Sequence, residues 1–346
     1  MKNKTVKKIL AAALSVVMVS SMLAGCGSQE SEEQSSESTA EETPADEADA
    51  EESGDAGKDV YKIGVIQYIQ HDALDASNEG FFAALDEMGI PYQVDQQNAA
   101  GETASCQTIS QTLVNNQNDL IFAIGTPAAQ AVAGVTSDIP IVLTAVTDPA
   151  ASGLVESNDA PGGNVTGTSD LTPVADQIDL LKKILPDAQK VGILYCSAES
   201  NSEIQASMAR EACEKLGMET EDYTVSSSNE IQTVVESAIG KVDALYAPTD
   251  NVIAVGMATV GMVANENGIP VICGESGMVD EGGLATYGID YYELGYMAGQ
   301  MAAEILVDGK NPADMPIEYL DADKCELAVN EETAEALQID LSSIEE

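Results

Sequence analysis

Hydrophobic segments of two lengths alternate along the chain from residue 60 onward. Tyr61–Ile66 is a short β-branched run bounded by turn-forming residues, which predicts a buried strand. The next segment, Asp75–Met88, places its large apolar side chains on one helical face and stops at Gly89, which predicts a helix. The pattern continues with a strand at Tyr92–Val94, a helix at Thr103–Asn115, a strand at Leu120–Ile124, a helix at Pro127–Val135 and a strand at Ile139–Leu143. Strands that alternate with helices of this length indicate βαβ units and a parallel sheet.

The same order of elements occurs a second time. Lys190–Leu194 repeats the pattern of Lys62–Ile66, and Val242–Tyr246 repeats that of Asn118–Phe122. We therefore expect an α/β protein of two similar lobes, each a parallel sheet flanked by helices, with a ligand cleft between them. The alternative is one large doubly wound sheet. We favour two lobes because residues 166–173 are rich in Gly, Thr, Ser and Asp, as a junction would be.

The segment that follows the second repeat predicts that the lobes are discontinuous in the chain. Gly283–Ile289 and a helix at Asp290–Leu306 exceed what the second repeat needs. In bilobal binding proteins with several crossovers, such a helix returns to the first lobe. We therefore expect a first lobe at residues 60–169 plus 288–315, and a second lobe at residues 170–287 plus 316–346.

The N-terminal residues carry a targeting pattern instead of a folding pattern. A basic stretch with Lys2 and Lys8 precedes an apolar run, Ile9–Leu23, and the run leads into Ala24-Gly25-Cys26. This pattern predicts a secretory signal peptide at residues 1–25 and a diacylated thiol on Cys26, as in bacterial lipoproteins. The alternative is a plain signal peptide followed by a chance cysteine. The apolar run is shorter than the roughly 20 residues that a membrane-spanning helix needs.

Residues 26–59 are composed mainly of Ser, Glu, Asp, Ala and Thr. Such a segment buries too little apolar surface to fold, so we expect a disordered acidic linker that lifts the domain off the membrane. A specific acidic interaction tail is the alternative. Together these features predict a protein anchored by lipid to the extracellular face of the cell membrane, and the long spacer favours a Gram-positive cell. Nucleotide cofactors are scarce there, and no cofactor is expected.

Composition argues against several classes of function. The formal net charge of −45 is unsuited to binding nucleic acid, which requires clustered Lys and Arg, and to electrostatic docking on anionic lipid.

Apart from Cys26 there are five widely spaced cysteines without a C-x-x-C motif, which favours buried free thiols over a disulfide framework or a zinc site. His71 is the sole histidine, which argues against a metal site. No G-x-S-x-G motif is present, and Gly274–Gly277 has the wrong spacing for one. Carboxylate pairs for glycoside hydrolysis are not ruled out by composition, but we expect no enzyme and no catalytic residue.

Several motifs occur in order over roughly residues 60–330 and resemble one family of proteins. They are Gln67–Asp75, Ala123–Ala131, Val146–Pro149, Asn164–Asp170, Pro248–Asn251 and Gly288–Gly295. The first is similar to the opening motif of the substrate-binding lipoproteins of ABC transporters that include tryptophan- and tyrosine-binding members, with Asp72 where the usual motif has Pro. The resemblance implies the fold of type I periplasmic binding proteins.

The same resemblance implies a function. It predicts an aromatic L-amino acid (tyrosine, phenylalanine or tryptophan) bound by cleft closure, and an ABC permease and ATPase as partners of a monomer. Sugars and nucleosides occupy clefts of the same fold, so they remain alternative ligands. A surface receptor or adhesin built on this fold is a further alternative.

An amino acid presents a carboxylate, which backbone N–H groups at a helix N-terminus can bind. Gly125-Thr126-Pro127 stands between a predicted strand and a predicted helix. The hydroxyl of Thr126 and the backbone N–H of Ala128, together with that of Ala129, are therefore candidate donors. Alternatively, Thr126 serves only as the helix N-cap.

The ammonium group of an amino acid requires carboxylates. Asp250 begins the equivalent helix of the second lobe, Asp170 lies at the junction, and Glu275 follows a predicted strand. Asp250 and Asp170 are the candidate ammonium ligands, with Glu275 and Asp290 as further candidates. Alternatively, Asp250 is only a helix cap and Asp170 only a hinge turn.

An aromatic side chain requires flat apolar or aromatic walls. Gln67, Tyr68 and His71 lie at or just after the end of the first predicted strand, where cleft residues belong. Tyr195 and Asn201 are placed in the equivalent loop of the second lobe. These five residues complete the predicted ligand-binding set.

Overall fold

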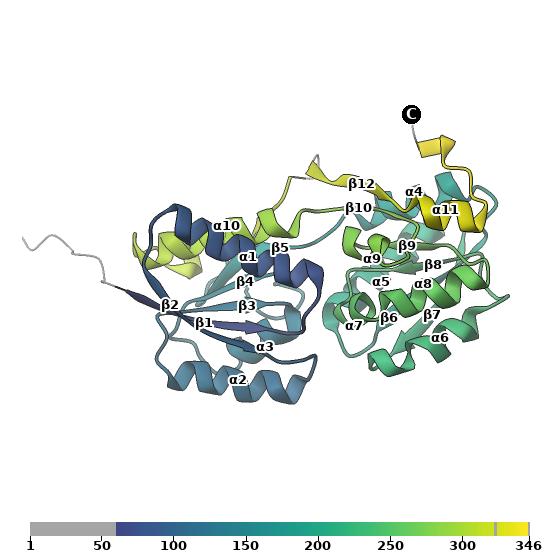
Figure 1. Cartoon of the computed structure of the whole chain (residues 1–346). Helices are drawn as coiled ribbons and strands as arrows, with labels where there is room; N and C mark the ends of the chain where they lie inside the picture. Colours follow the sequence, from purple (N-terminus) through teal and green to yellow (C-terminus); the bar gives the residue numbers. More distant parts are fainter. Residues whose placement is uncertain (1–59, 322–323, 345–346) are drawn as a thin grey trace, which may run out of the picture. The chain divides into compact units, whose positions relative to one another are not determined.

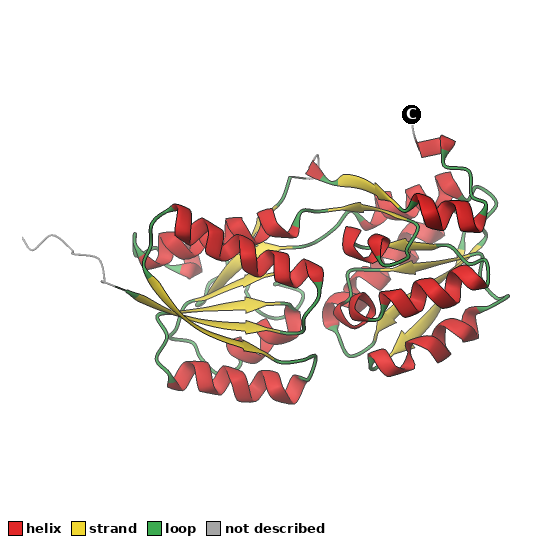
Figure 2. Ribbon diagram, in the orientation of Figure 1, coloured by secondary structure: helices red, strands yellow, loops and turns green. Residues whose placement is uncertain are grey.

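The computed structural model describes residues 60–321 and 324–344. The predicted signal peptide, Cys26 and the acidic linker lie outside these residues. The described residues all belong to one compact unit, residues 55–346, and they contain two six-stranded sheets with helices on both faces (Figure 2). This arrangement confirms the predicted α/β class with two similar lobes.

The first sheet has the strand order β11-β5-β4-β3-β1-β2, and every neighbouring pair is parallel. Its strands are β1 (Tyr61–Gln67), β2 (Tyr92–Asn98), β3 (Leu120–Ile124), β4 (Ile141–Thr144), β5 (Val165–Ser169) and β11 (Glu318–Tyr319). The sequences of β3 and β4, LIFAI and IVLT, are almost entirely apolar and fully buried because helices cover both faces of a parallel sheet.

Helices from distant parts of the chain cover the first sheet (Figure 1). One face carries α1 (Asp72–Glu87) and α10 (Tyr291–Leu306), and the other carries α2 (Thr103–Asn115) and α3 (Thr126–Ala133). The ring of Phe81 on α1 stacks on that of Phe122 on β3, with centroids 3.8 Å apart. The two helices α1 and α10 approach so closely that a Cβ on Gly80 or Gly295 would overlap the backbone of the other helix.

The second sheet has the order β12-β10-β9-β8-β6-β7, and it is parallel except for the β12–β10 pair. Its strands are β6 (Lys190–Cys196), β7 (Glu219–Val225), β8 (Ala244–Ala247), β9 (Val271–Cys273), β10 (Ala285–Gly288) and β12 (Glu326–Val329). The helices of this lobe are α4 (Val174–Ile184), α5 (Ser200–Lys215), α6 (Ile231–Ala238), α7 (Asn251–Val255), α8 (Met257–Glu266), α9 (Ser276–Asp280) and α11 (Glu331–Leu337). Separate apolar clusters fill the two sides of the sheet.

The chain passes between the two sheets after β5, after β10 and after β11, and the helix α10 packs against α1 of the first lobe. One predicted boundary is corrected. We expected the first lobe to end at residue 315, but β11 hydrogen-bonds to β5 and extends the first sheet to Tyr319. A strand of two exposed residues carries no hydrophobic pattern, and so its place was not visible in the sequence.

Three other properties of the described residues bear on function. Cys106, Cys196, Cys213 and Cys273 are buried free thiols, and Cys325 is partly exposed. Within the described ranges, no helix combines the length and apolar character that crossing a membrane requires. The same ranges contain no group of three or more His, Cys, Asp or Glu residues placed to hold a metal ion.

Candidate ligand-binding site

A narrow cavity lies where the carboxyl ends of the two sheets face each other. It is lined by His71, Leu74, Ala145, Asp170 and Tyr291, and by Asn201, Thr249, Asp250, Asn251, Ala254 and Glu275 of the second lobe. The free space inside is only about 10 Å³, room for at most about one water molecule. Five of the ten residues predicted from the sequence line this cavity, and they come from both lobes.

Hydrogen bonds join the lobes around the cavity. Nε2 of His71 lies 3.1 Å from Oδ1 of Asn251, and Nε2 of Gln205 donates to Oγ1 of Thr147 at 3.0 Å. The Asn251 amide is oriented by Glu199, since its Nδ2 donates to Oε2 of that residue. The amide oxygen therefore faces the imidazole, so Nε2 of His71 carries the proton and donates it. Burial lowers the pKa of His71, which favours this neutral form.

Two carboxylates in the cavity have oxygens that are available to accept further hydrogen bonds. Oδ2 of Asp170 accepts a hydrogen bond from the Tyr291 hydroxyl at 3.0 Å, while its buried Oδ1 has no partner. Glu275 occupies the N-cap position of α9 but makes no capping hydrogen bond. Burial raises the pKa of Asp170 to about 6, and burial together with repulsion from Asp170 raises that of Glu275 to about 8.

Asp250 lies in the same cavity, but both of its carboxylate oxygens already accept hydrogen bonds from backbone N–H groups. Its Oδ1 accepts from the backbone N–H of Ile253 at 2.8 Å, and its Oδ2 accepts from that of Cys196 at 2.5 Å. The contact with Ile253 is the helix cap that the sequence left open as an alternative, and the contact with Cys196 ties Asp250 to the end of β6. Burial raises the pKa of Asp250 because both oxygens are removed from water. Beside it, Asn201 donates from Nδ2 to Oε2 of Glu199, and its buried Oδ1 has no partner.

The start of α3 faces the second lobe. Gly125, not Thr126, is the N-cap residue, with φ at +93°, and a Cβ placed there would lie 4.0 Å from Oδ1 of Asn251. Thr126 is the first helical residue, and its buried Oγ1 has no partner. The N–H of Ala129 is used within the helix, bonding to the Gly125 carbonyl at 3.0 Å. The N–H groups of Thr126 and Ala128 in this first turn lack intrahelical partners, as at any helix start.

Three residues that the sequence predicted as ligand-binding, Gln67, Tyr68 and Tyr195, do not line the cavity. Nε2 of Gln67 donates to Oδ1 of Asp75 at 2.6 Å, and the Tyr68 hydroxyl donates to the Gly101 carbonyl at 2.9 Å. Tyr195 is not in a loop, because β6 continues to Cys196.

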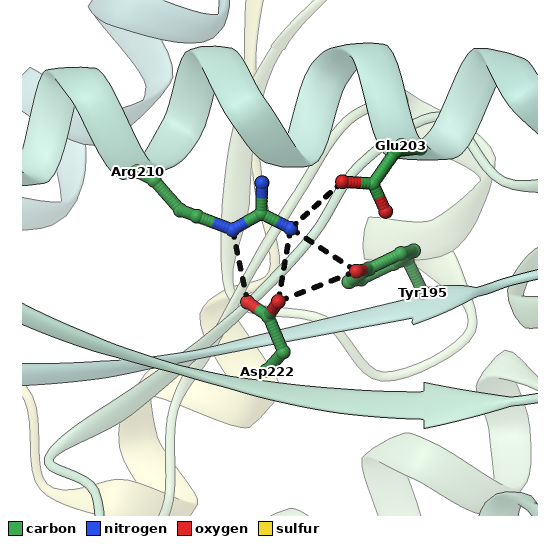
Figure 3. Close-up of polar contacts among 4 residues, drawn as sticks. All are labelled: Tyr195, Glu203, Arg210 and Asp222. Atoms are coloured by element: carbon green, nitrogen blue, oxygen red, sulfur yellow. Dashed lines mark hydrogen bonds and ion pairs between the residues drawn. The ribbon is translucent and has the colours of Figure 1, made fainter.

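The hydroxyl of Tyr195 belongs to a polar cluster between β6, α5 and β7 (Figure 3). Arg210 donates to it at 3.0 Å and binds Asp222 through Nε and Nη2 at 3.1 and 2.9 Å. The same guanidinium contacts Glu203 at 3.1 Å. This cluster fixes α5 against the edge strand β7, and Tyr195 is therefore absent from the cavity lining.

Sequence reasoning missed several lining residues. Tyr291 and Asn251 lie inside motifs that carried the resemblance, immediately after Asp290 and Asp250. Only the packing of α10 on the first lobe brings Tyr291 to Asp170, and no local pattern shows this. Ala145 adopts a left-handed conformation with φ at +54°, which a sequence does not display and which is uncommon for a residue with a Cβ.

The chain matches the family model of the ABC transporter substrate binding proteins over residues 62–344, and it belongs to this family. It is 39% identical over 337 residues to the tyrosine-binding protein of Clostridioides difficile strain R20291, covering 96% of this chain and 93% of that protein.

Two solved structures are also similar. One is an ABC domain from Streptococcus pneumoniae in complex with L-Trp, with a TM-score of 0.78 and 37% identity, covering 81% of this chain and 95% of that one. The other is the ligand-free, open structure of a substrate-binding protein with adhesive properties from Clostridium difficile. It has a TM-score of 0.64 and 42% identity, covering 82% of this chain and 97% of that one.

Proposed function

We propose that this chain is the extracellular, lipid-anchored component of an ABC importer and binds an aromatic L-amino acid between its lobes. We expect tyrosine or phenylalanine to bind ahead of tryptophan. The observation that carries the proposal is the cavity itself, which buried carboxylates from both lobes line. The start of α3 does not line it but lies beside it, since a Cβ on Gly125 would contact the lining residues Leu74 and Asn251. Family membership favours binding and delivery over catalysis.

The charges in the cavity suit a zwitterion. Within the described residues, no Lys or Arg side chain lines it, whereas Asp170, Asp250 and Glu275 do. A buried carboxylate is stabilised by a cation, and an α-ammonium group supplies one. The carboxylate of the same ligand suits the first turn of α3, where the dipole and the free N–H groups favour an anion. There Thr126 offers a buried hydroxyl that has no partner.

His71 and Tyr291 provide the flat walls of the cavity. An aromatic side chain can stack on the edge or face of either ring. The two relatives named for tyrosine or solved with L-Trp are themselves 37–39% identical to this chain, which supports the aromatic class.

Closure of the lobes supports binding between them. The chain is more similar in sequence to the protein in the open structure, yet more similar in structure to the L-Trp complex. Hydrogen bonds such as His71–Asn251 join the lobes in this conformation. A ligand that contacts both lobes stabilises the closed state over the open one.

Calorimetry on the full chain in detergent tests the proposal. The ligands are L-tyrosine, L-phenylalanine, L-tryptophan, L-leucine, glucose and adenosine, with tyramine and 3-phenylpropionate as analogues that lack the carboxylate or the amine. We expect the three aromatic amino acids to bind and both analogues to bind at least tenfold more weakly, since each loses a charged hydrogen-bonding group. Tight binding of glucose or adenosine, with none of an amino acid, would contradict the proposed ligand class.

A further inference from the structure

Asp170 and Glu275 are the two carboxylates in the cavity whose hydrogen-bonding capacity is not fully used, since Asp170 accepts only from Tyr291 and Glu275 does not cap its helix. Each is only 5% exposed. Oδ1 of Asp170 has no partner, and the Glu275 carboxylate does not cap the helix that it precedes. Leaving such groups buried is costly, because water no longer solvates them and no donor replaces it. Asp250 differs, since two backbone N–H groups already bind its oxygens.

Glu275 also borders a second, outer cavity. This space of about 250 Å³ shares His71, Ala254 and Glu275 with the inner cavity. Its other lining residues are Gln70, Asp72, Val255, Gly277 and Glu281. Glu275 therefore borders both the inner site and a larger space, which offers a route for a proton to reach solvent.

The charged and titratable groups around this pair are almost all acidic or neutral. They are Asp72 and the neutral His71 at the start of α1, Asp250 before α7, Asp280 on α9, Glu281 after it, and Tyr291 on α10. Within the described residues, no Lys or Arg lines either cavity. Two mutually repelling carboxylates without a cation cannot both remain ionised cheaply, so a proton is the group that neutralises one of them.

We propose that Asp170 and Glu275 together bind the ammonium group of the ligand, and that the ligand displaces a proton which this pair holds in its absence. The inference rests on the proposed function, because it requires a ligand with an ammonium group. Before binding, Glu275 is a carboxylic acid and Asp170 a carboxylate. After binding, both are carboxylates beside the –NH₃⁺ group, and one proton has passed to solvent. The high pKa of Glu275, about 8, agrees with this order of events.

Proton release makes affinity depend on pH. If one proton leaves for each ligand bound, the dissociation constant falls about tenfold for each unit of rising pH below the pKa of the group that releases it. For Glu275 that range lies below about pH 8. We expect Kd for L-tyrosine to fall about tenfold from pH 6.0 to pH 7.0.

The test is calorimetry of the full chain with L-tyrosine at pH 7.2 in phosphate and in Tris, two buffers with different enthalpies of protonation. We expect the apparent binding enthalpies to differ by an amount that corresponds to release of about one proton. In Glu275→Gln this difference should disappear, and affinity should fall by at least tenfold, as it should in Asp170→Asn. Glu266→Gln is the matched control, because Glu266 is an exposed carboxylate on α8 outside both cavities.

The outcomes separate the two proposals. If the wild-type chain binds no amino acid, the proposed function fails and this inference fails with it. If the wild-type chain binds L-tyrosine with equal enthalpies in the two buffers, or if Glu275→Gln keeps wild-type affinity, only the inference fails. Should either variant not fold, as judged by its far-UV circular dichroism, the wild-type buffer comparison and pH series alone decide the matter.

Discussion

Asp250 and Glu275 both precede short helices of the second lobe, and both carboxylates line the same cavity. The side chain of Asp250 caps its helix and also accepts from the end of β6, so its role is architectural. Glu275 is buried to a similar degree without such donors. Two acidic residues at equivalent N-cap positions therefore behave differently, because the contacts of each oxygen decide whether it is free to bind a ligand.

Thr126 permits a prediction in which stability and affinity change in opposite directions. Its hydroxyl is buried without a partner, so Thr126→Val, which keeps the shape of the side chain, should leave the unfolding free energy unchanged or raise it by up to about 1 kcal/mol. Loss of the hydroxyl donor should weaken binding of L-tyrosine about tenfold, equivalent to about 1–2 kcal/mol. Urea denaturation and calorimetry measure the two effects.

Thr126→Ser is the control for this prediction, since it keeps the hydroxyl and removes only a methyl group. Unchanged affinity in Thr126→Val would show that the hydroxyl does not contact the ligand.

At the scale of elements, the crossing of α1 and α10 brings Tyr291 to the cavity. Gly295 lies at the closest approach, where a Cβ would overlap the backbone of Ser77. Gly295→Ala should therefore separate the helices, lower the unfolding free energy by about 1–3 kcal/mol and weaken ligand binding as Tyr291 moves. Thermal unfolding and calorimetry test both effects.

Gly163→Ala is the matched control for Gly295→Ala, because nothing lies within 4 Å of a Cβ at that position. Wild-type stability in Gly295→Ala would mean that the two helices can separate without loss of packing energy.

The sequence predicted those elements whose buried positions form a regular pattern of apolar residues along the chain. The strand β3 and the helix α1 were found because one is apolar throughout and the other is apolar on one face. The strand β11 was missed because two exposed residues have no periodicity. The repeated order of elements was sufficient to predict two lobes, since each repeat must bury its own sheet.

The candidate site was less predictable than the fold. Asp170, Asp250 and Glu275 were identified as acids near strand ends, and all three line the cavity. Their separate roles depend on which backbone groups reach each carboxylate, and that is a property of tertiary packing. Tyr195 was misplaced because the predicted strand ended at Leu194, whereas β6 continues to Cys196 and the Tyr195 hydroxyl bonds to Arg210.

At the scale of the whole molecule, the buried acids predict how stability depends on pH. The pKa of Glu275 is raised to about 8 and that of Glu199 is also raised, mainly by burial, so the folded state holds protons that the unfolded state has released. Stability should therefore fall as pH rises from 6.5 to 8, by about 1.4 kcal/mol per pH unit for each such carboxyl. The pKa of His71 is lowered in the folded state, so titration of His71 makes stability rise with pH. This opposite effect is confined to the range below about pH 6.5.

Urea denaturation of the unliganded chain at pH 6.5, 7.2 and 8.0 measures this dependence. Glu275→Gln should show a shallower decline, since one of the titrating carboxyls is gone. Stability that rises over this range would contradict the assignment of protonated acids to the closed site.

The proposed lipid anchor predicts the behaviour of the whole protein in cells. Cys26→Ala removes the thiol that would carry the acyl chains, so the protein should lose lipid labelling and either appear in the medium or retain its first 25 residues. Cell fractionation and mass spectrometry measure the outcome, with Cys325→Ala as the control that should stay anchored. A Cys26→Ala protein with unchanged mass, labelling and membrane association would contradict the anchor.

The return of α10 and β11 to the first lobe has a consequence for the order in which the protein can fold. The first lobe begins with β1 at Tyr61, but its sheet is not complete until β11 ends at Tyr319, after nearly all of the second lobe has been made. Until then, α1 lacks the helix that covers it and β5 has an open edge. Contacts so distant in sequence form slowly, because a long loop must close before they contribute. We therefore expect the first lobe to remain incompletely folded until most of the second lobe has been made, a state that suits the export across a membrane proposed above.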